Sequence, residues 1–210
     1  KDRIKTFSIG FCDREYDESK YASEIASHYG TEHNSIILNK KHMKDLNKVI
    51  YHLDEPLADF ASLPTYVLSK FASEKVKVVL TGEGGDENFG GYSYYKKFEM
   101  MNKKIFIPKK ILYNKKIFYH EKLLNKFLLL DKFRESKDHM KEKLVNNYFN
   151  KGDFFNQMLK WDTKIWLPDD LLMKVDKTTM AFGLEARVPF LDHKFMEYVA
   201  TLDPKLKVQK

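Results

Sequence analysis

The alternation of strand-like and helix-like segments over residues 4–80 is the feature that most constrains the fold. Runs rich in β-branched and apolar residues predict strands at 4–11, 34–38 and 76–80. Apolar residues at helical spacing predict helices between them, at 17–30, 43–53 and 64–71. This order is typical of an α/β fold, a parallel sheet with flanking helices. Ligands of such sheets bind beyond the carboxyl ends of the strands, here Gly10–Phe11 and Thr81–Asp86.

Residue types at the segment ends predict several helix boundaries. Asp17 is suited to cap the first helix, and Gly30 stands where its C-terminal cap belongs. Pro168 is suited to the first turn of a helix running to residue 183, because that turn needs no proline N–H. Asp192 is expected to cap the last helix.

A basic segment separates these regions. Residues 102–150 hold 13 Lys or Arg and five Asp or Glu, a balance of +8, whereas the whole chain carries +7. Because Lys alternates with apolar residues there, we interpret the segment as solvated amphipathic helices; nucleic-acid binding is the less favoured alternative. We therefore expect one domain over 1–210, made of an α/β nucleotide-binding core, a basic helical insertion and a helical part that completes the site, at 1–96, 97–160 and 161–210.

Composition narrows the class of protein further. Cys12 is the only cysteine, so an internal disulfide framework is excluded. No apolar run approaches the roughly 18 residues of a membrane helix, and the first residues do not resemble a signal peptide. We expect a cytoplasmic protein without membrane contact, entered midway, since residue 1 is not Met and a strand follows at once.

The segment Leu80-Thr-Gly-Glu-Gly-Gly-Asp-Glu-Asn-Phe-Gly-Gly-Tyr92 carries the strongest functional signal. Its glycines allow tight turns, and backbone N–H groups exposed in such turns bind anions. It also holds the carboxylates Glu83, Asp86 and Glu87, which would repel phosphate unless a divalent cation lay between them. The pattern therefore favours a nucleotide–Mg²⁺ site, although a solvated turn stays open as the alternative. No Lys-Ser/Thr follows the glycines, which disfavours a P-loop kinase.

The same segment resembles the Ser-Gly-Glu-Gly-x-Asp-Glu-x-Phe-Gly-Gly-Tyr signature of asparagine synthetases, with Thr81 in place of Ser. A second long match runs from Leu167-Pro-Asp-Asp-Leu-Leu-Met through Leu184-Glu-Ala-Arg-Val-Pro-Phe-Leu-Asp192, and Phe7–Phe11 and Asp54–Pro56 fit as well. The resemblance covers residues 4 to about 206, with 97–160 poorly matched. It implies a fold similar to the adenine nucleotide alpha hydrolases of the pyrophosphatase-loop type.

The resemblance also implies a reaction. ATP would adenylate the side-chain carboxylate of aspartate, and ammonia released from glutamine by a glutaminase domain of the same full-length chain would attack to give asparagine, AMP and pyrophosphate. Glu83 resembles the residue that takes a proton from the attacking ammonia. Asp86 is similar to the carboxylate that holds Mg²⁺ on the pyrophosphate. The other ATP contacts that the resemblance implies are Ile9, Thr81, Gly82 and Gly84.

Other residues are weaker candidates for the acceptor site or for supporting roles. They are Asp54, Glu55, Tyr92, Asp176 and Arg187. Arg187 could clamp an anion, but an ion pair with Glu185 or Asp192 is the favoured interpretation. Asp59-Phe60-Ala61 offers no Arg for the free carboxylate of aspartate, which leaves the acceptor acid open.

The family's Ser-Gly-Gly-x-Asp-Ser loop, expected before Phe7, does not occur in this sequence. We therefore expect these residues alone to be inactive. Two alternatives remain: a relative that amidates another carboxylic acid or closes a lactam, and a non-catalytic scaffold of the same fold. Whether the protein forms a homodimer is left open.

Overall fold

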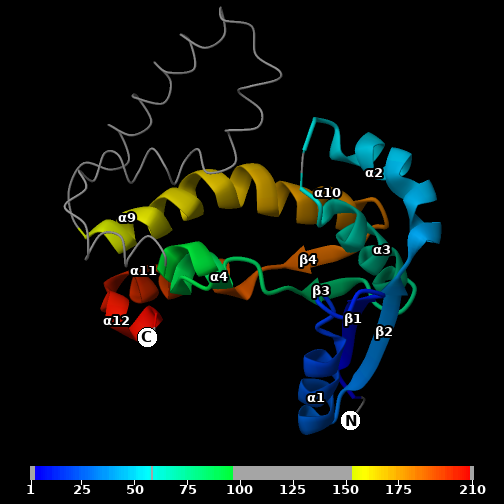
Figure 1. Cartoon of the computed structure of the whole chain (residues 1–210), viewed down its shortest axis with the longest axis horizontal. Coiled ribbons are helices and arrows are strands. Elements are labelled where there is room, and N and C mark those ends of the chain that lie inside the picture. The colour runs from blue at the N-terminus through cyan, green and yellow to red at the C-terminus, as the bar shows by residue number, and fades with distance from the viewer. Residues whose placement is uncertain (1–2, 58, 97–152, 209–210) are drawn as a thin grey trace, which may run out of the picture. The chain divides into compact units, whose positions relative to one another are not determined.

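The computed structural model describes residues 3–57, 59–96 and 153–208 (Figure 1). The chain divides into two compact units. The first comprises Lys1–Thr81 and Pro168–Pro189, and the second comprises Gly82–Leu167 and Phe190–Lys210. Most of the basic insertion predicted at 97–160 lies outside the described residues.

A parallel pair of strands begins the first unit. β1 (Lys5–Phe11) pairs with β2 (Glu32–Leu38) from Lys5 opposite Glu32 to Phe11 opposite Leu38. The helix α1 (Ser19–Tyr29) connects them, as a parallel pair requires (Figure 1). Gly30 ends α1 in the left-handed conformation with φ 63°, so its predicted capping role is confirmed.

Successive side chains of a strand point to opposite faces, so each face of this pair carries its own set of residues. On one face Ile9, Ile36 and Leu38 pack against a buried cluster. Its members come from α2 (Leu46–Leu53) and α3 (Ser62–Ser73), and they are Val49, Leu53, Leu63, Tyr66 and Val67. The 3-10 turn η1 (Lys40–Asp45) leads from β2 into α2.

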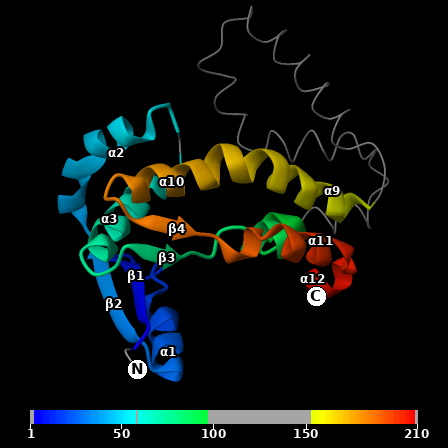
Figure 2. The ribbon, with the colours of Figure 1, turned by 180° about the vertical axis from the view of Figure 1, so that it is seen from behind.

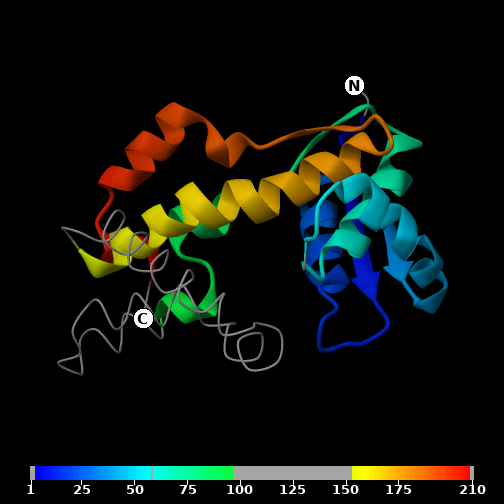
Figure 3. The same cartoon turned by 90° about the horizontal axis from the view of Figure 1, so that it is seen from above.

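A second parallel pair completes the first unit. β3 (Val78–Leu80) lies beside β4 (Glu185–Arg187), and α10 (Met173–Met180), which precedes β4, packs against α3 (Figure 3). The described residues thus form two small parallel sheets flanked by helices, where one sheet was predicted. β4 was not predicted, because Glu185-Ala-Arg187 is short, mostly charged and without an apolar run.

The second unit is helical in its described part. Its elements are α4 (Gly85–Phe89), α9 (Phe154–Trp161), the first part of the π-helix η2 (Asp162–Leu172), α11 (His193–Thr201) and α12 (Pro204–Lys207). The 3-10 turn η3 (Pro189–Leu191) precedes α11, and α11 lies beside α4 (Figures 1 and 2). A buried cluster forms the core: Tyr95, Phe154, Phe155, Met158, Leu159 and Trp161.

Three of the other predicted boundaries can be compared with the structure. Asp192 caps α11 by accepting the Phe195 N–H at 3.0 Å, as predicted. Asp17 is not the cap of α1, because Glu18 occupies that position; Asp17 instead accepts the Ser19 N–H and hydroxyl. Pro168 does not start a helix but lies inside η2, where the wider turn replaces the α-helical hydrogen-bond pattern.

No helix in the described part of the chain is long and apolar enough to cross a membrane.

Candidate functional site

The loop that follows β3 takes its form from two glycines with positive φ. Gly84, at φ 88°, precedes α4, and Gly90, at φ 74°, ends it. The Gly85 N–H donates to the Gly82 carbonyl at 3.2 Å, which closes the turn before the helix. Because α4 has only five residues, its dipole is small, and any anion binding here depends on the loop's own N–H groups.

Close contacts explain why two of these positions are glycine. A Cβ on Gly84 would lie 2.1 Å from Leu191 Cδ2, and a Cβ on Gly91 would lie 1.8 Å from Asp86 Oδ1. Gly82 differs, because a Cβ there would meet no atom within 4 Å. The loop therefore packs tightly behind Gly84, leaves open space at Gly82, and holds the Asp86 carboxylate against Gly91.

The three carboxylates of the loop have different environments. Asp86 is exposed, and its carboxylate forms no hydrogen bond or ion pair with the rest of the described chain. Glu87 is only 2% exposed, and its Oε1 accepts the Tyr92 hydroxyl at 2.6 Å. Glu83 is half-buried. All three were predicted to lie at a nucleotide–Mg²⁺ site, but in the structure Glu87 points inward to Tyr92 and Asp86 stays accessible to a ligand.

Thr81 lies at the end of β3, and its main chain is anchored there. Its N–H donates to the Arg187 carbonyl at 2.9 Å. Its hydroxyl oxygen is buried and has no hydrogen-bond partner among the described residues. Since a buried hydroxyl without a partner is unfavourable, this atom is suited to a polar ligand group. Within the second unit, the open space at Gly82 and the accessible Asp86 carboxylate fit a nucleotide phosphate with its magnesium ion.

Tyr92 belongs to an aromatic cluster of the second unit. Its ring is stacked on Tyr94 at 5.3 Å and lies 5.1 Å from Trp166. Burial, together with the hydrogen bond to Glu87, raises the pKa of the Tyr92 hydroxyl far above its ordinary value. Tyr92 therefore remains a protonated donor to Glu87 under all ordinary conditions.

Ion pairs hold the loop on which the acceptor was predicted to bind. Lys177 donates to Asp54 Oδ2 at 2.5 Å, and Lys174 donates to Asp59 Oδ2 at 2.6 Å. Asp54 has φ 63°, the only positive φ of a non-glycine residue in the described chain. Glu55, next to it, is exposed. Neither lysine was predicted as a site residue, although their spacing of three residues places them on one side of a helix.

The remaining candidates lie on α10 and β4. Arg187 donates from Nε to Glu185 Oε1 at 2.8 Å, the pairing that the sequence analysis favoured over an anion clamp. Asp176 is exposed, and its backbone carbonyl accepts the Thr179 hydroxyl at 3.2 Å. The charge of Asp176 adds to the larger effect of Asp54 in raising the pKa of Lys177.

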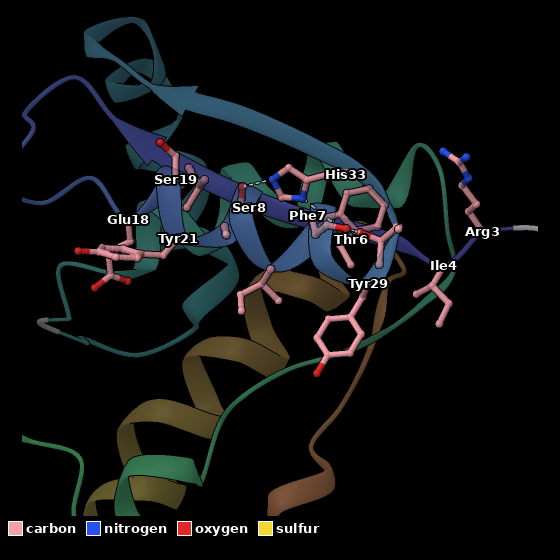
Figure 4. Close-up of a pocket in the computed structure, with 16 residues that line it drawn as sticks. Arg3, Ile4, Thr6, Phe7, Ser8, Glu18, Ser19, Tyr21, Tyr29 and His33 are labelled. Atoms are coloured by element: carbon pink, nitrogen blue, oxygen red, sulfur yellow. Dashed lines mark hydrogen bonds between the residues drawn. The ribbon is translucent and has the colours of Figure 1, made fainter.

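Ile9 lines a groove of about 820 Å³ between β1 and α1 (Figure 4). His33 also lines this groove and forms hydrogen bonds with Thr6 at 3.0 Å and Ser8 at 3.2 Å. The wall carries Tyr21, Ile25 and Tyr29 of α1. Of the candidate site residues, Ile9 is the one that lines this groove.

The sequence matches a known protein family and several curated proteins. The sequence model of the family described as asparagine synthase matches residues 1–210. The glutamine-hydrolysing asparagine synthetase 1 of Bacillus subtilis (strain 168) is 33% identical over 98% of this chain, which corresponds to 38% of the relative. The enzymes named asparagine synthetase from Bos taurus and asparagine synthetase 2 from Oryza sativa subsp. japonica are 27% and 30% identical over 99% of this chain, and 28% and 27% of their own lengths. The chain thus spans well under half the length of these curated relatives.

Proposed function

The chain belongs to the asparagine synthase family, and from this premise we propose that its full-length protein uses ATP to form a carboxamide. In this proposal the side-chain carboxylate of aspartate is adenylated, and ammonia from glutamine converts it to asparagine with release of AMP and pyrophosphate. A glutaminase domain of the full-length chain supplies the ammonia. The proposed fold is that of the adenine nucleotide alpha hydrolases with a pyrophosphatase-type loop, and residues 1–210 belong to one synthetase domain.

The observation that carries the proposal is the exposed Asp86 carboxylate, held against Gly91 without a partner in the described chain. A carboxylate that is free of protein donors can coordinate a metal ion at no cost in broken ion pairs. Bound Mg²⁺ would neutralise phosphate charge and stabilise the departing pyrophosphate. Asp86 is the residue we assign to hold it.

The other candidate residues are assigned to nucleotide binding and to proton transfer. The buried Thr81 hydroxyl gains a partner when it bonds a polar group of ATP, and the open space at Gly82 admits the nucleotide against the backbone. Gly84 and Ile9 are the further residues that we assign to ATP binding. Glu83 accepts the proton that ammonia loses when it attacks the activated carbonyl carbon.

The identity of the acceptor acid rests on a separate observation. The loop that contains Asp54 and Asp59 meets two lysines, Lys177 and Lys174, and each lysine is already in an ion pair with one of these aspartates. A free α-carboxylate of aspartate would have to compete with an aspartate of the protein. This favours, as a second candidate, amidation of an acid that has no second carboxylate.

The test is ATP–pyrophosphate release by the full-length protein, screened over carboxylic acids with glutamine or ammonia as donor. We expect Asp86→Asn to lower pyrophosphate release at least about 100-fold, and Glu83→Gln to spare that step while amide formation falls about 100-fold. Glu197→Gln, an exposed carboxylate on α11, is the matched control. Release that depends on aspartate supports asparagine formation, whereas release only with another acid supports the second candidate. No release with any acid would overturn the proposal.

A further inference from the structure

The loop contains a buried carboxylate that the proposed reaction does not use. Glu87 follows Asp86 directly and is 2% exposed, with its Oε1 2.6 Å from the Tyr92 hydroxyl. Burying a carboxylate is unfavourable unless it is well bonded, and an apolar residue of similar size would serve packing at least as well. The presence of a carboxylate at Glu87 is better explained by its hydrogen bond with Tyr92, which fixes the conformation of the loop.

That bond closes the loop across its two glycines. The N–H groups of Gly90 and Gly91 both donate to the Asp86 carbonyl, at 2.7 and 3.1 Å. Five residues of helix cannot hold this arrangement alone, because so short a helix is unstable by itself. The bond from Glu87 to Tyr92 joins the helix to the residue just beyond the glycines, and so fixes the backbone from which the Asp86 carboxylate projects.

Tyr92 is itself held rigidly, which makes its hydroxyl a fixed point. Its ring is stacked on Tyr94 with only 17° between the two planes. Tyr94 donates to Asp162 at 2.8 Å, and Tyr95 donates to the same carboxylate, which is 1% exposed. A chain of ring and hydrogen-bond contacts therefore connects α4 to the start of η2 within the second unit.

We propose that Glu87 and Tyr92 are a pair of positioning residues that fix the Asp86 carboxylate for the metal–nucleotide complex. This inference rests on the proposed function, because Asp86 has its metal-binding role only there. Glu87 touches neither substrate nor metal in this proposal. It acts through the backbone of α4, and Tyr92 acts through Glu87.

The experiment compares Tyr92→Phe, Glu87→Gln and the control Tyr198→Phe in the full-length protein. Tyr198 is exposed on α11, and loss of its hydroxyl leaves the loop untouched. The first measurement is amide hydrogen exchange without ligands, at the N–H groups of Asn88, Gly90 and Gly91, which bond carbonyls inside the loop. We expect exchange to rise about tenfold in Tyr92→Phe, the effect of one lost hydrogen bond to a carboxylate, and to stay unchanged in the control.

The second measurement is the Mg²⁺ concentration that gives half-maximal pyrophosphate release. We expect it to rise about five- to tenfold in Tyr92→Phe while the KM for the acceptor acid stays constant. Glu87→Gln keeps an oxygen that accepts the Tyr92 hydroxyl, so it should stay within about threefold of the unchanged protein.

Four outcomes decide whether Glu87 and Tyr92 are positioning residues. Unchanged exchange in Tyr92→Phe would overturn the positioning role, and so would an equal rise in the acceptor KM and the Mg²⁺ requirement. Faster exchange with a selective rise in the Mg²⁺ requirement supports it. Faster exchange in a protein whose unchanged form releases no pyrophosphate would support the positioning of the loop and overturn the proposed function.

Discussion

Gly84 and Gly82 stand two residues apart in the loop, yet only one of these positions requires glycine. We expect Gly84→Ala to lower the free energy of unfolding by about 2–4 kcal/mol, because φ 88° is unfavourable for alanine and its Cβ would collide with Leu191. Gly82→Ala should change that free energy by less than about 0.5 kcal/mol, since its Cβ meets open space. Urea unfolding of the two variants is the measurement, and equal losses would contradict the loop geometry.

The tyrosines of the aromatic cluster give a pH dependence. Burial raises the pKa of Tyr92, Tyr94 and Tyr95 far above their ordinary value of 10.0, with nearby carboxylates adding to the effect. Because the folded pKa exceeds the unfolded one, their contribution to stability is complete below about pH 10 and is lost as the pH rises further.

We therefore expect the unfolding free energy to decrease steadily above about pH 10, and these three tyrosines to ionise only when the protein unfolds. Absorbance of tyrosinate, followed together with circular dichroism during an alkaline titration, checks both points. Ionisation of all 12 tyrosines before any loss of structure would contradict the burial of this cluster.

At the scale of elements, α10 is tied to the loop before α3 by two lysines of unequal burial. The Lys174 side chain is 6% exposed and its partner Asp59 is 16% exposed, whereas the side chains of Lys177 and Asp54 are 37% and 68% exposed. We expect Lys174→Met to lower the unfolding free energy by about 2–4 kcal/mol, because it leaves the Asp59 charge without its partner. Lys177→Met, three residues later on the same helix, is the matched control and should cost much less.

Asp59→Asn tests the cause of that loss. In the Lys174→Met background it removes the uncompensated charge, so it should restore part of the stability measured by urea unfolding. If Asp59→Asn lowered stability equally with and without Lys174, the two residues would not be coupled, and the ion pair would not be what joins α10 to this loop.

The elements that the sequence predicted correctly are those fixed by local chemistry. Gly30 and Asp192 end and begin helices through bonds to residues a few positions away, so their roles could be seen in the sequence. β4 and η2 could not, because a three-residue strand exists only through its partner β3, and the π-helix departs from the periodicity that sequence patterns report. The one predicted sheet became two small sheets for the same reason: strand pairing is a long-range property.

In the candidate site, too, local features were predicted from the sequence and long-range contacts were not. The glycines of the loop predicted a tight turn, and the structure contains one at Gly82–Gly85. The burial of Glu87 was not visible in the sequence, because its partner Tyr92 packs on a cluster that includes residues far along the chain, such as Phe155 and Met158. The bond between Lys174 and Asp59 joins residues 115 positions apart, a contact that no local pattern encodes. The roles assigned to Glu83, Asp86 and Thr81 remain predictions.

At the scale of the molecule, the first unit exposes a set of large apolar side chains around the groove of Figure 4. Ile4, Tyr21, Ile25 and Tyr29 are each more than half accessible and line the same groove. The last three recur at intervals of four, so they form one stripe along α1. A contiguous apolar surface of this kind binds amphipathic dyes and promotes association.

Replacing the stripe should therefore change surface behaviour without changing stability. We expect Tyr21→Gln, Ile25→Gln and Tyr29→Gln together to reduce the fluorescence of bound anilinonaphthalene sulfonate by at least about half, with less than about 0.5 kcal/mol lost per substitution, since glutamine suits helices and the side chains are already exposed. Ile50→Gln with Tyr51→Gln, on exposed positions of α2 outside the groove, is the control and should leave most of the dye bound. A large fall in the unfolding free energy would instead mean that the stripe is covered by the protein itself, and the groove between β1 and α1 would then not exist in solution.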